Sequence, residues 1–413
     1  MNRELGFSQA GPKMQKALGQ KTANHLINDS YHSEIIELPK NSYHRITRCQ
    51  DLAAILSIDK SDRKIQRLAL YSLITKSKLW ELEVLQAHEA DHLSNFILSA
   101  QGLVLVAVPS TKQTRIIWNG KQSGMLPETD WKWIMPIGMR ILGCFAEKKH
   151  NITNHFYSEW DQEGNRLSSY KLDYTQGRWT HTCVCDENFW VRLSGSKQAD
   201  LASIIEIVDR TLGKIRTFAL PLNADEERFS SAHIVQNQLF YSKSSIRSKE
   251  FYNPTVCIFD LLKGATVEEF PTGAEMGELK NLSATEDYAA WLEYRGNKDD
   301  RVRYLNVLNK TIQDVTNVPY CLDNPNVNLD ITGTALSITY AGVSWNYGGA
   351  RWHRKVIDMT NGQLKSEVNY KRLPAGLCSI VNGNLLITEQ FSDAPQMHIE
   401  SFFGEGAKSS FRS

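Results

Sequence analysis

The sequence SIIEIVDRTLGKIRTFAL, at residues 203–220, decides the fold class. A run of β-branched residues ends at Asp209, a turn containing Gly213 follows, and a second alternating run begins at Lys214. β-branched and aromatic residues favour strands, whereas Asp and Gly favour tight turns. The segment therefore predicts two antiparallel strands joined by a short turn.

The junction in this hairpin, an apolar residue followed by Asp, Glu or Asn and then a turn, recurs eight times along the chain. The instances are Trp80-Glu81, Trp118-Asn119, Trp160-Asp161, Val208-Asp209, Phe259-Asp260, Leu305-Asn306, Ile357-Asp358 and Ile399-Glu400. Successive polar members are 38 to 52 residues apart, which is close to the length of one β-propeller blade. We expect these polar side chains to hydrogen-bond the backbone of each turn.

Short alternating strands bounded by Gly, Asn, Asp and Ser continue to the end of the chain and predict an all-β fold. We expect a single β-propeller of eight four-stranded blades over residues 33–413, with a polar extension at 1–32. The last unit is one strand short, and the isolated strand-like segment Ser33–Leu38 can complete it. Pairing both ends of the chain in one blade closes the ring and removes an exposed sheet edge.

Residues 40–85 also allow a helical interpretation. Asp51–Ile58 and Ser61–Lys76 carry apolar residues at helical spacing, and Ser61 is suited to an N-cap. In this alternative, residues 33–85 form a helical preface and residues 86–413 form a seven-bladed propeller.

The composition excludes several classes of protein. Hydrophobic residues make up 41% and charged residues 23%, so a sizeable core is expected, and the net charge of +1 gives no electrostatic footprint for nucleic acid or anionic membrane. The seven scattered cysteines do not predict a disulfide framework. The longest apolar run, Leu103–Val108, is too short to span a bilayer, and the first residues lack a secretory apolar core. We expect a monomer in the cytoplasm or nucleus.

The segment His88–Trp118 resembles a WD repeat. Its matching features are an opening histidine, a first hairpin and a closing strand: His88 or His92, Ser99–Gly102 and Thr114–Asn119. In that family a histidine, a turn aspartate and the strand tryptophan form a structural hydrogen-bonded network. Residues 110–113 replace the aspartate here, and the other units keep only the final dipeptide. The resemblance implies a degenerate WD-like or quinoprotein-like ring.

A second segment loosely resembles an F-box. The elements in order are Leu38-Pro39, Ile46, Asp51-Leu52 and Leu79-Trp80. Residues 41–45 are polar where that family has an apolar first helix. The resemblance implies, as an alternative function, a substrate receptor of a ubiquitin ligase.

Two motifs have the residue types of a metal site. His88-Glu89-Ala90-Asp91-His92 matches H-E-x-x-H, but it lies between strand-like segments, whereas zinc binding by this motif requires a helix. Cys183 and Cys185 share one face of a strand with His181, as buried structural cysteines also do. We predict no catalytic residue, metal or cofactor, although an enzymatic or sugar-binding site in the propeller channel is a second alternative.

Aromatic and cationic residues gather in the segments between strands. The candidate partner-binding residues are Trp131, Trp133, Arg178, Trp179, Arg247, Trp345, Tyr347, Arg351 and Trp352. Lys249, Phe251, Tyr252 and Arg295 lie in similar positions. Trp, Tyr and Arg dominate binding hot spots because they bury large areas with few rotatable bonds. We therefore predict a non-enzymatic protein-interaction scaffold, in which the rings are apolar anchors on one face and the arginines pair with acidic groups of a protein or peptide.

Overall fold

The structure is a computed structural model, and it describes most of the chain from residue 32 to residue 401. The described ranges are 32–38, 42–49, 51–59, 66–85, 95–108, 113–126, 130–149, 152–172, 178–196, 201–221, 226–247, 250–295, 300–318, 327–342, 351–370, 379–381, 384–389 and 396–401. Within these ranges the regular elements are all strands, which confirms the predicted all-β class.

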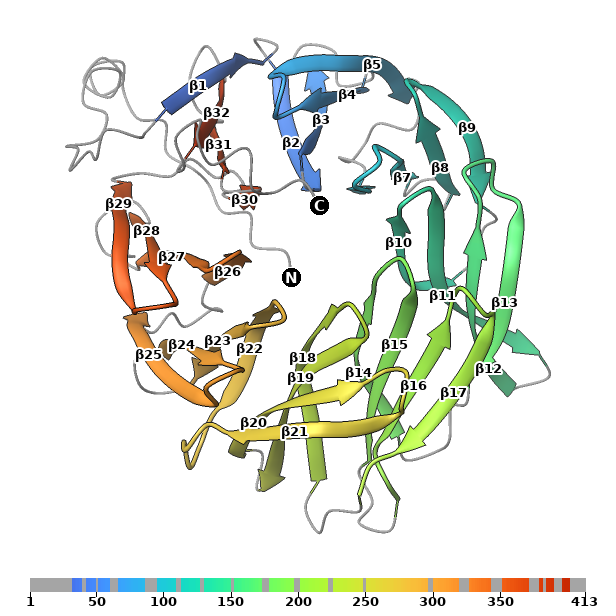
Figure 1. Ribbon diagram of the computed structural model, residues 1–413. Coiled ribbons are helices and arrows are strands. Elements are labelled where there is room, and N and C mark those ends of the chain that lie inside the picture. The colour runs from blue at the N-terminus through green and yellow to red at the C-terminus, as the bar shows by residue number, and fades with distance from the viewer. Residues whose placement is uncertain are drawn as a thin grey trace, which may run out of the picture.

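The strands form eight four-stranded antiparallel sheets arranged in a ring (Figure 1). The first four sheets in chain order contain β2 (Ser42–Cys49), β3 (Leu52–Asp59), β4 (Gln66–Ser72) and β5 (Ser77–Leu85); β6 (Asn95–Leu98), β7 (Val104–Val108), β8 (Gln113–Trp118) and β9 (Lys121–Leu126); β10 (Asp130–Ile137), β11 (Arg140–Lys149), β12 (Ile152–Trp160) and β13 (Arg166–Leu172); β14 (Arg178–Cys185), β15 (Phe189–Ser196), β16 (Ile204–Asp209) and β17 (Lys214–Ala219).

The other four sheets complete the ring. They contain β18 (Glu226–Val235), β19 (Gln238–Arg247), β20 (Glu250–Asp260) and β21 (Ala265–Pro271); β22 (Glu278–Ala284), β23 (Tyr288–Tyr294), β24 (Asp300–Asn306) and β25 (Thr311–Val318); β26 (Val327–Thr332), β27 (Ala335–Gly342), β28 (Arg351–Asp358) and β29 (Gln363–Tyr370); β30 (Ser379–Val381), β31 (Asn384–Glu389), β32 (Gln396–Ser401) and β1 (His32–Glu37). The preferred count of eight blades is confirmed.

The last sheet joins the two ends of the chain. β1 pairs antiparallel with β32, with Ser33 opposite Glu400 and Ile35 opposite His398. The sheet order is β1-β32-β31-β30, so the N-terminal strand supplies the fourth strand that the C-terminal unit lacks. This closure was predicted from the sequence and is confirmed.

The helical alternative for residues 33–85 is wrong for the described part of that range. Residues 42–49, 52–59, 66–72 and 77–85 form one antiparallel sheet, β2 to β5. The physical reason is burial on both faces: six successive residues of β3, 53–58, are buried, so its apolar residues form a continuous run rather than a helical stripe. The described residues of the segment that resembles an F-box are thus strands of this sheet.

Within each sheet the chain moves outward from the centre of the ring, as β22 to β25 and β26 to β29 show in Figure 1. Because neighbouring strands are antiparallel, the turns from first to second and from third to fourth strands lie on one side of the ring, which we call the turn rim. Connections from second to third strands and between sheets lie on the opposite side, the linker rim.

The repeated polar residues shape the turn rim. Asp260 Oδ1 accepts hydrogen bonds from the backbone N–H groups of Leu262 and Lys263, at 2.9 and 2.8 Å. Equivalent contacts are made by Asp161, Asp209, Asn306 and Asp358. Side chains of this type satisfy backbone donors that the strand ladder leaves without partners. The predicted role of the repeated dipeptide is thus confirmed in five sheets.

One instance of the dipeptide is misplaced. Trp80-Glu81 lies inside β5 rather than before a turn, and Glu81 forms an ion pair with Lys78. The corresponding turn follows β4, where Ser72 Oγ accepts a hydrogen bond from the N–H of Thr75 at 3.1 Å. A hydroxyl replaces the carboxylate at this position, so the pattern of an apolar residue followed by an acid is absent from this turn and occurs instead inside β5.

The hydrophobic core lies between adjacent sheets. One cluster joins the sheet β14–β17 to the sheet β18–β21 through buried side chains that include Val191, Leu193, Ile205, Ile207, Leu239, Tyr241, Cys257 and Phe259. Full burial of such side chains contributes about 1.5–3 kcal/mol each. Each sheet is therefore held mainly by its neighbours, and the rims remain available for polar groups.

Candidate functional site

The candidate residues predicted from the sequence gather on the linker rim. Trp131 lies near the start of β10, Arg178 and Trp179 begin β14, and Arg247 ends β19. Arg351 and Trp352 begin β28, whereas Trp345 and Tyr347 lie outside the described residues. All six described positions are at strand ends, not in the loops where the sequence placed them; their side chains are not among those described.

Trp133 is the one candidate whose side chain is described, and it packs between two sheets. It belongs to the core between the sheets β10–β13 and β14–β17 and stacks on Trp190, with ring centroids 6.0 Å apart. A register shift in β10 between Trp131 and Trp133 separates the two tryptophans along the strand. The structure thus places Trp133 in interblade packing rather than among the exposed side chains of the rim.

One part of the linker rim lies where the sheet β18–β21 meets the sheet β22–β25. The connection between them, residues 272–277, is tied to the start of β20: the N–H of Gly277 donates to Phe251 O, and the N–H of Asn253 donates to Glu275 O, both at 3.0 Å. Thr272 N–H also donates to Pro254 O at 3.0 Å. These backbone bonds fix the first strand of one sheet against the third strand of the other.

Five side chains form a chain of contacts across this junction, which we call the Glu278 cluster. The guanidinium of Arg228 lies over the ring of Phe251, 5.2 Å from its centroid, and Arg228 Nε is 3.7 Å from Glu278 Oε1. Lys280 Nζ is 3.4 Å from Glu278 Oε2 and 4.0 Å from the centroid of the Tyr294 ring. One carboxylate thus lies between two cations, and each cation lies over an aromatic ring.

The burial of this cluster is uneven. The side chain of Glu278 is 8% exposed, whereas those of Arg228 and Lys280 are 49% and 29% exposed. The acid is covered and the cations face the solvent, so two positive charges meet one negative charge at this surface. Cation–π contacts hold cations over the electron-rich faces of rings and leave their remaining N–H donors available.

The acids beside the cluster differ in burial. Glu293 is fully buried, and its two carboxylate oxygens accept from Arg301 Nε at 2.9 Å and Arg303 Nη1 at 3.2 Å. Glu250, which is exposed, accepts a hydrogen bond from the hydroxyl of Tyr252 at 2.7 Å. The exposed positive charge of the cluster is supplied by Arg228 and, in part, by Lys280, and the exposed carboxylates of Glu250 and Glu275 lie beside it.

Sequence reasoning found only part of this cluster. Phe251, next to Arg247 and Lys249, was noted as an aromatic residue of this rim, but Arg228, Glu278 and Lys280 were missed. Their signal is a charge at the start of an innermost strand, in Glu-Arg-Phe at 227–229 and Glu-Leu-Lys at 278–280. The two segments lie 50 residues apart, and only their contact in the fold makes the charges one cluster. The sequence alone does not show that Arg228 pairs with Glu278.

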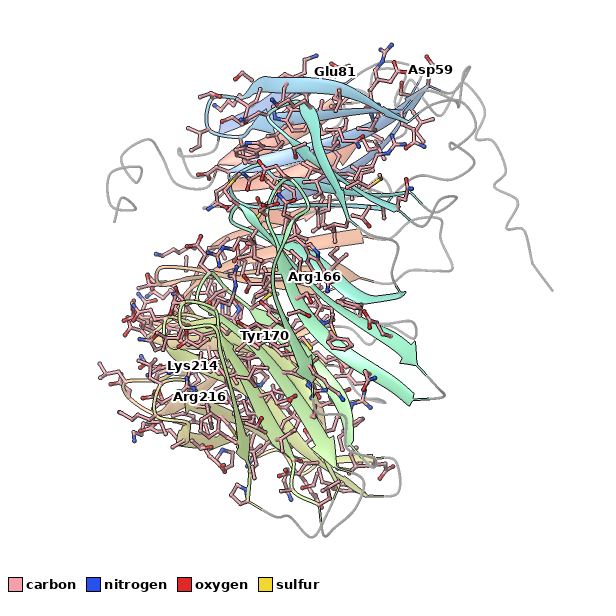
Figure 2. The ribbon with its side chains drawn as sticks, turned by 90° about the vertical axis from the view of Figure 1, so that its right-hand side faces the viewer. Asp59, Glu81, Arg166, Tyr170, Lys214 and Arg216 are labelled. Carbon is pink, nitrogen blue, oxygen red and sulfur yellow. The ribbon has the colours of Figure 1, made fainter. Side chains whose placement is uncertain are left out.

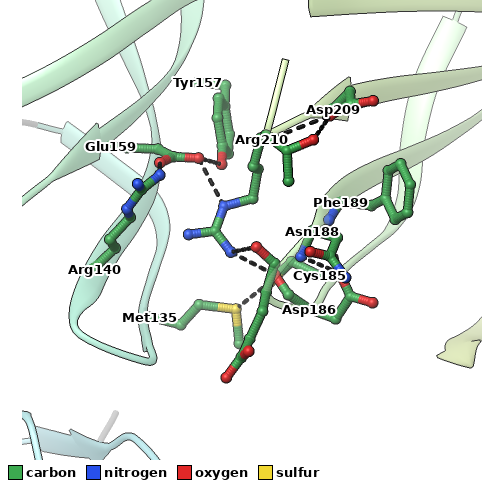
Figure 3. A network of polar contacts seen from close by, with 12 residues as sticks. Met135, Arg140, Tyr157, Glu159, Cys185, Asp186, Asn188, Phe189, Asp209 and Arg210 are labelled. Carbon is green, nitrogen blue, oxygen red and sulfur yellow. Dashed lines mark hydrogen bonds and ion pairs between the residues drawn. The ribbon is translucent and has the colours of Figure 1, made fainter. Parts of the chain in front are cut away.

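A second glutamate lies between two cations on the turn rim, in what we call the Glu159 cluster (Figure 3). Glu159 Oε1 accepts from Arg210 Nε at 2.8 Å and from the Tyr157 hydroxyl at 2.7 Å, and Oε2 accepts from Arg140 Nη1 at 3.2 Å. Arg210 also donates to the backbone oxygens of Asp186 and Glu187. Burial, reinforced by the Glu159 carboxylate, raises the pKa of Tyr157 above its ordinary value.

The cysteine motif is part of the core next to this cluster. Cys183 and Cys185 both pack between the sheets β10–β13 and β14–β17, and Cys185 Sγ is 2.9 Å from Met135 Sδ. Burial raises the pKa of Cys183 to about 12, which keeps this thiol protonated. Among the described residues no group of three or more His, Cys, Asp or Glu side chains is arranged to hold a metal ion. The H-E-x-x-H segment, 88–92, lies outside the described residues.

The described residues contain no helix that is long and apolar enough to cross a membrane.

Comparison with known proteins identifies the fold. No model of a known protein family matches this sequence, and no curated protein matches it. Among solved structures, the WD40 domain of SCAP from fission yeast aligns at a TM-score of 0.54 with 9% identity, over 91% of this chain and 99% of that chain. Sqt1 of Saccharomyces cerevisiae aligns at 0.51 with 11% identity, over 90% and 98%.

A computationally designed protein, Ika8, is similar to the same degree, at a TM-score of 0.54 with 12% identity, over 89% of this chain and 99% of that chain. At such identities the likeness concerns the fold alone. The chain therefore has the fold of a WD40-type β-propeller, as the WD-like segment at 88–118 predicted.

Proposed function

We propose that this protein is a non-enzymatic interaction scaffold that binds a protein segment on its linker rim. The observation that carries the proposal is the Glu278 cluster, in which exposed cations and aromatic rings are held at the junction of two sheets. Aromatic and arginine side chains presented on a rigid frame dominate the energetics of protein binding.

The proposal is supported by the position of the candidates predicted from the sequence. Arg178, Trp179, Arg247, Arg351 and Trp352 begin or end strands on the same rim as the Glu278 cluster. A partner segment that crosses this rim meets aromatic or cationic residues contributed by several sheets. Binding residues concentrate in the connections of a rigid scaffold, because the sequence of a connection can vary without disturbing the core.

Affinity purification with quantitative mass spectrometry tests the proposal. Cells expressing the tagged full chain are compared with cells expressing a double variant, Arg228→Ala with Phe251→Ala. The matched control is Arg166→Ala, which removes an exposed arginine that lies over Phe145 and Trp160, at 5.7 and 5.9 Å from their ring centroids, at the start of β13 on the turn rim (Figure 2).

We expect a set of proteins that the wild-type chain and the Arg166→Ala variant recover equally and that the double variant loses. All three chains must show the same thermal midpoint, so that a loss of partners reflects the surface and not unfolding. If the double variant recovers the same proteins in the same amounts, the linker rim at this junction is not the binding surface.

A further inference from the structure

The Glu278 cluster also specifies the chemistry of its partner, an inference that rests on the function proposed above. Glu278 is shared between Arg228 and Lys280 at 3.7 and 3.4 Å. Charge-assisted hydrogen bonds between such groups are ordinarily about 2.7–2.9 Å long. Neither cation is therefore fully engaged by the glutamate, and both can turn toward another acceptor.

The charge within the Glu278 cluster is unbalanced. Arg228 and Lys280 carry two positive charges against the one negative charge of Glu278, while the exposed carboxylates of Glu250 and Glu275 lie in the adjoining strand and connection. Arg228 is half exposed, so a ligand reaches its guanidinium without any rearrangement of the strands. A second carboxylate at this point would balance the charge of the cluster and accept hydrogen bonds from both cations.

The aromatic members add an apolar component. Phe251 and Tyr294 are half-buried, and each presents a ring face to one of the cations. Met276, in the connection between the two sheets, is 45% exposed and so is accessible to a ligand at the same junction. An apolar side chain next to an acidic residue would therefore find contacts at the same junction.

We infer that the Glu278 cluster binds an acidic peptide segment of a partner protein, with a glutamate or aspartate side chain entering between Arg228 and Lys280 and a neighbouring apolar side chain packing near Met276. The carboxylate accepts hydrogen bonds from both cations, while Glu278 remains in place and holds them at the correct separation. No covalent step is involved. Binding is electrostatic in large part, so it weakens as salt is added.

Fluorescence anisotropy with the full chain tests this inference. The probes are three labelled twelve-residue peptides of equal length, in which Phe alternates with Glu, with Gln or with Lys. We expect the Glu peptide to bind more tightly than the Gln peptide, and the Lys peptide to bind least. Arg228→Glu should weaken binding of the Glu peptide at least about tenfold, since it places a like charge against the ligand.

Two further variants separate binding from a structural role. Glu278→Gln keeps the shape of the side chain and removes its charge, which leaves both cations uncompensated, so the Glu peptide should bind several-fold more tightly. A residue that only supported the strands would lose affinity on this change. Arg166→Glu is the matched control for Arg228→Glu and should leave the affinity unchanged.

The inference is overturned if the Glu and Gln peptides bind equally, or if Arg166→Glu weakens binding as much as Arg228→Glu does. These results are distinct from failure of the proposed function. If cellular partners depend on Arg228 and Phe251 but the Glu peptide has no advantage, the surface is a binding site for another class of segment. If neither the recovery of cellular partners nor the binding of the Glu peptide depends on Arg228, both proposals are wrong.

Discussion

The Glu159 and Glu278 clusters have the same components but differ in how closely the glutamate contacts its two cations. Each places one glutamate between two cations beside aromatic rings, at a junction of two neighbouring sheets. Glu159 receives three donors within 3.2 Å, and of its two cations Arg210 is 3% exposed and Arg140 is 51% exposed. Glu278 has two cations at 3.4 and 3.7 Å, one of them half exposed.

The difference shows how one motif can serve two purposes. In the Glu159 cluster the carboxylate accepts three hydrogen bonds and Arg210 is buried, so the cluster joins two sheets firmly, and only Arg140 reaches the solvent. In the Glu278 cluster, aromatic rings and longer ion pairs position Arg228 and Lys280. Both cations therefore keep N–H donors that a ligand can use. A buried ion pair is costly to break, whereas an exposed one contributes little to stability.

The largest expected change in the free energy of unfolding is that caused by Glu159→Ala. Removing this carboxylate leaves the guanidinium of Arg210 buried without its charged partner, which costs about 3–5 kcal/mol for a buried pair. Thermal and urea unfolding should both show the loss. The matched variant, Glu278→Ala, should cost no more than about 1 kcal/mol because its partners reach solvent. Equal losses for the two variants would remove the distinction between the clusters.

A smaller loss is expected for Trp133→Ala. This side chain packs on Trp190 between two sheets, and truncating a tryptophan leaves a cavity, so we expect a destabilisation of up to about 3 kcal/mol, the lower end of the range for large aromatic residues. Affinity for the Glu peptide should be unchanged at a temperature well below the unfolding midpoint. If Trp133→Ala weakened peptide binding and left stability unaltered, Trp133 would be part of the binding surface.

The smallest expected effect concerns Asp358, one of the repeated residues of the turn rim. The hydroxyl of Thr360 and the ammonium of Lys365 lower the pKa of this carboxyl from 3.8 to about 2. A lowered pKa means that its contribution to stability is present above about pH 4 and is lost as the pH falls toward 2.

The Asp358→Asn variant should therefore have a lower thermal midpoint than the wild-type chain at pH 7, and the difference should shrink at pH 3. Because the carboxyl lies near solvent, the shift will be small and is best measured by scanning calorimetry on both chains in parallel. A difference that stays constant from pH 7 to pH 3 would show that the charge of Asp358 does not stabilise the turn.

Local chemistry explains which parts of the fold were predictable. Alternating strands and polar turn residues repeat in the sequence, and each repeat is decided by a few neighbouring residues, so the sheets and the turns at Asp161, Asp209 and Asp260 were found. The closing strand was found because one unit lacked a strand and Ser33–Leu38 had no other partner. The error at Trp80-Glu81 arose where Ser72 performs the role of an acid.

The site was less predictable because it is assembled between sheets. Composition does not separate Trp133 from a residue of the rim, and only its place in the register of β10 puts it in the core between two sheets. Arg228 and Glu278 come from different sheets and acquire their role only through contact. The interblade position of Arg210 was equally hidden, since a residue that follows a turn aspartate would ordinarily be exposed.

Hydrogen–deuterium exchange with and without the Glu peptide tests the central claim most directly, because it observes both clusters in one experiment. The account predicts slower exchange in segments around Arg228, Phe251 and Glu278, and no change around Glu159 or Arg210. Slower exchange around Glu159 and Arg210, with none at the junction of β18–β21 and β22–β25, would contradict it.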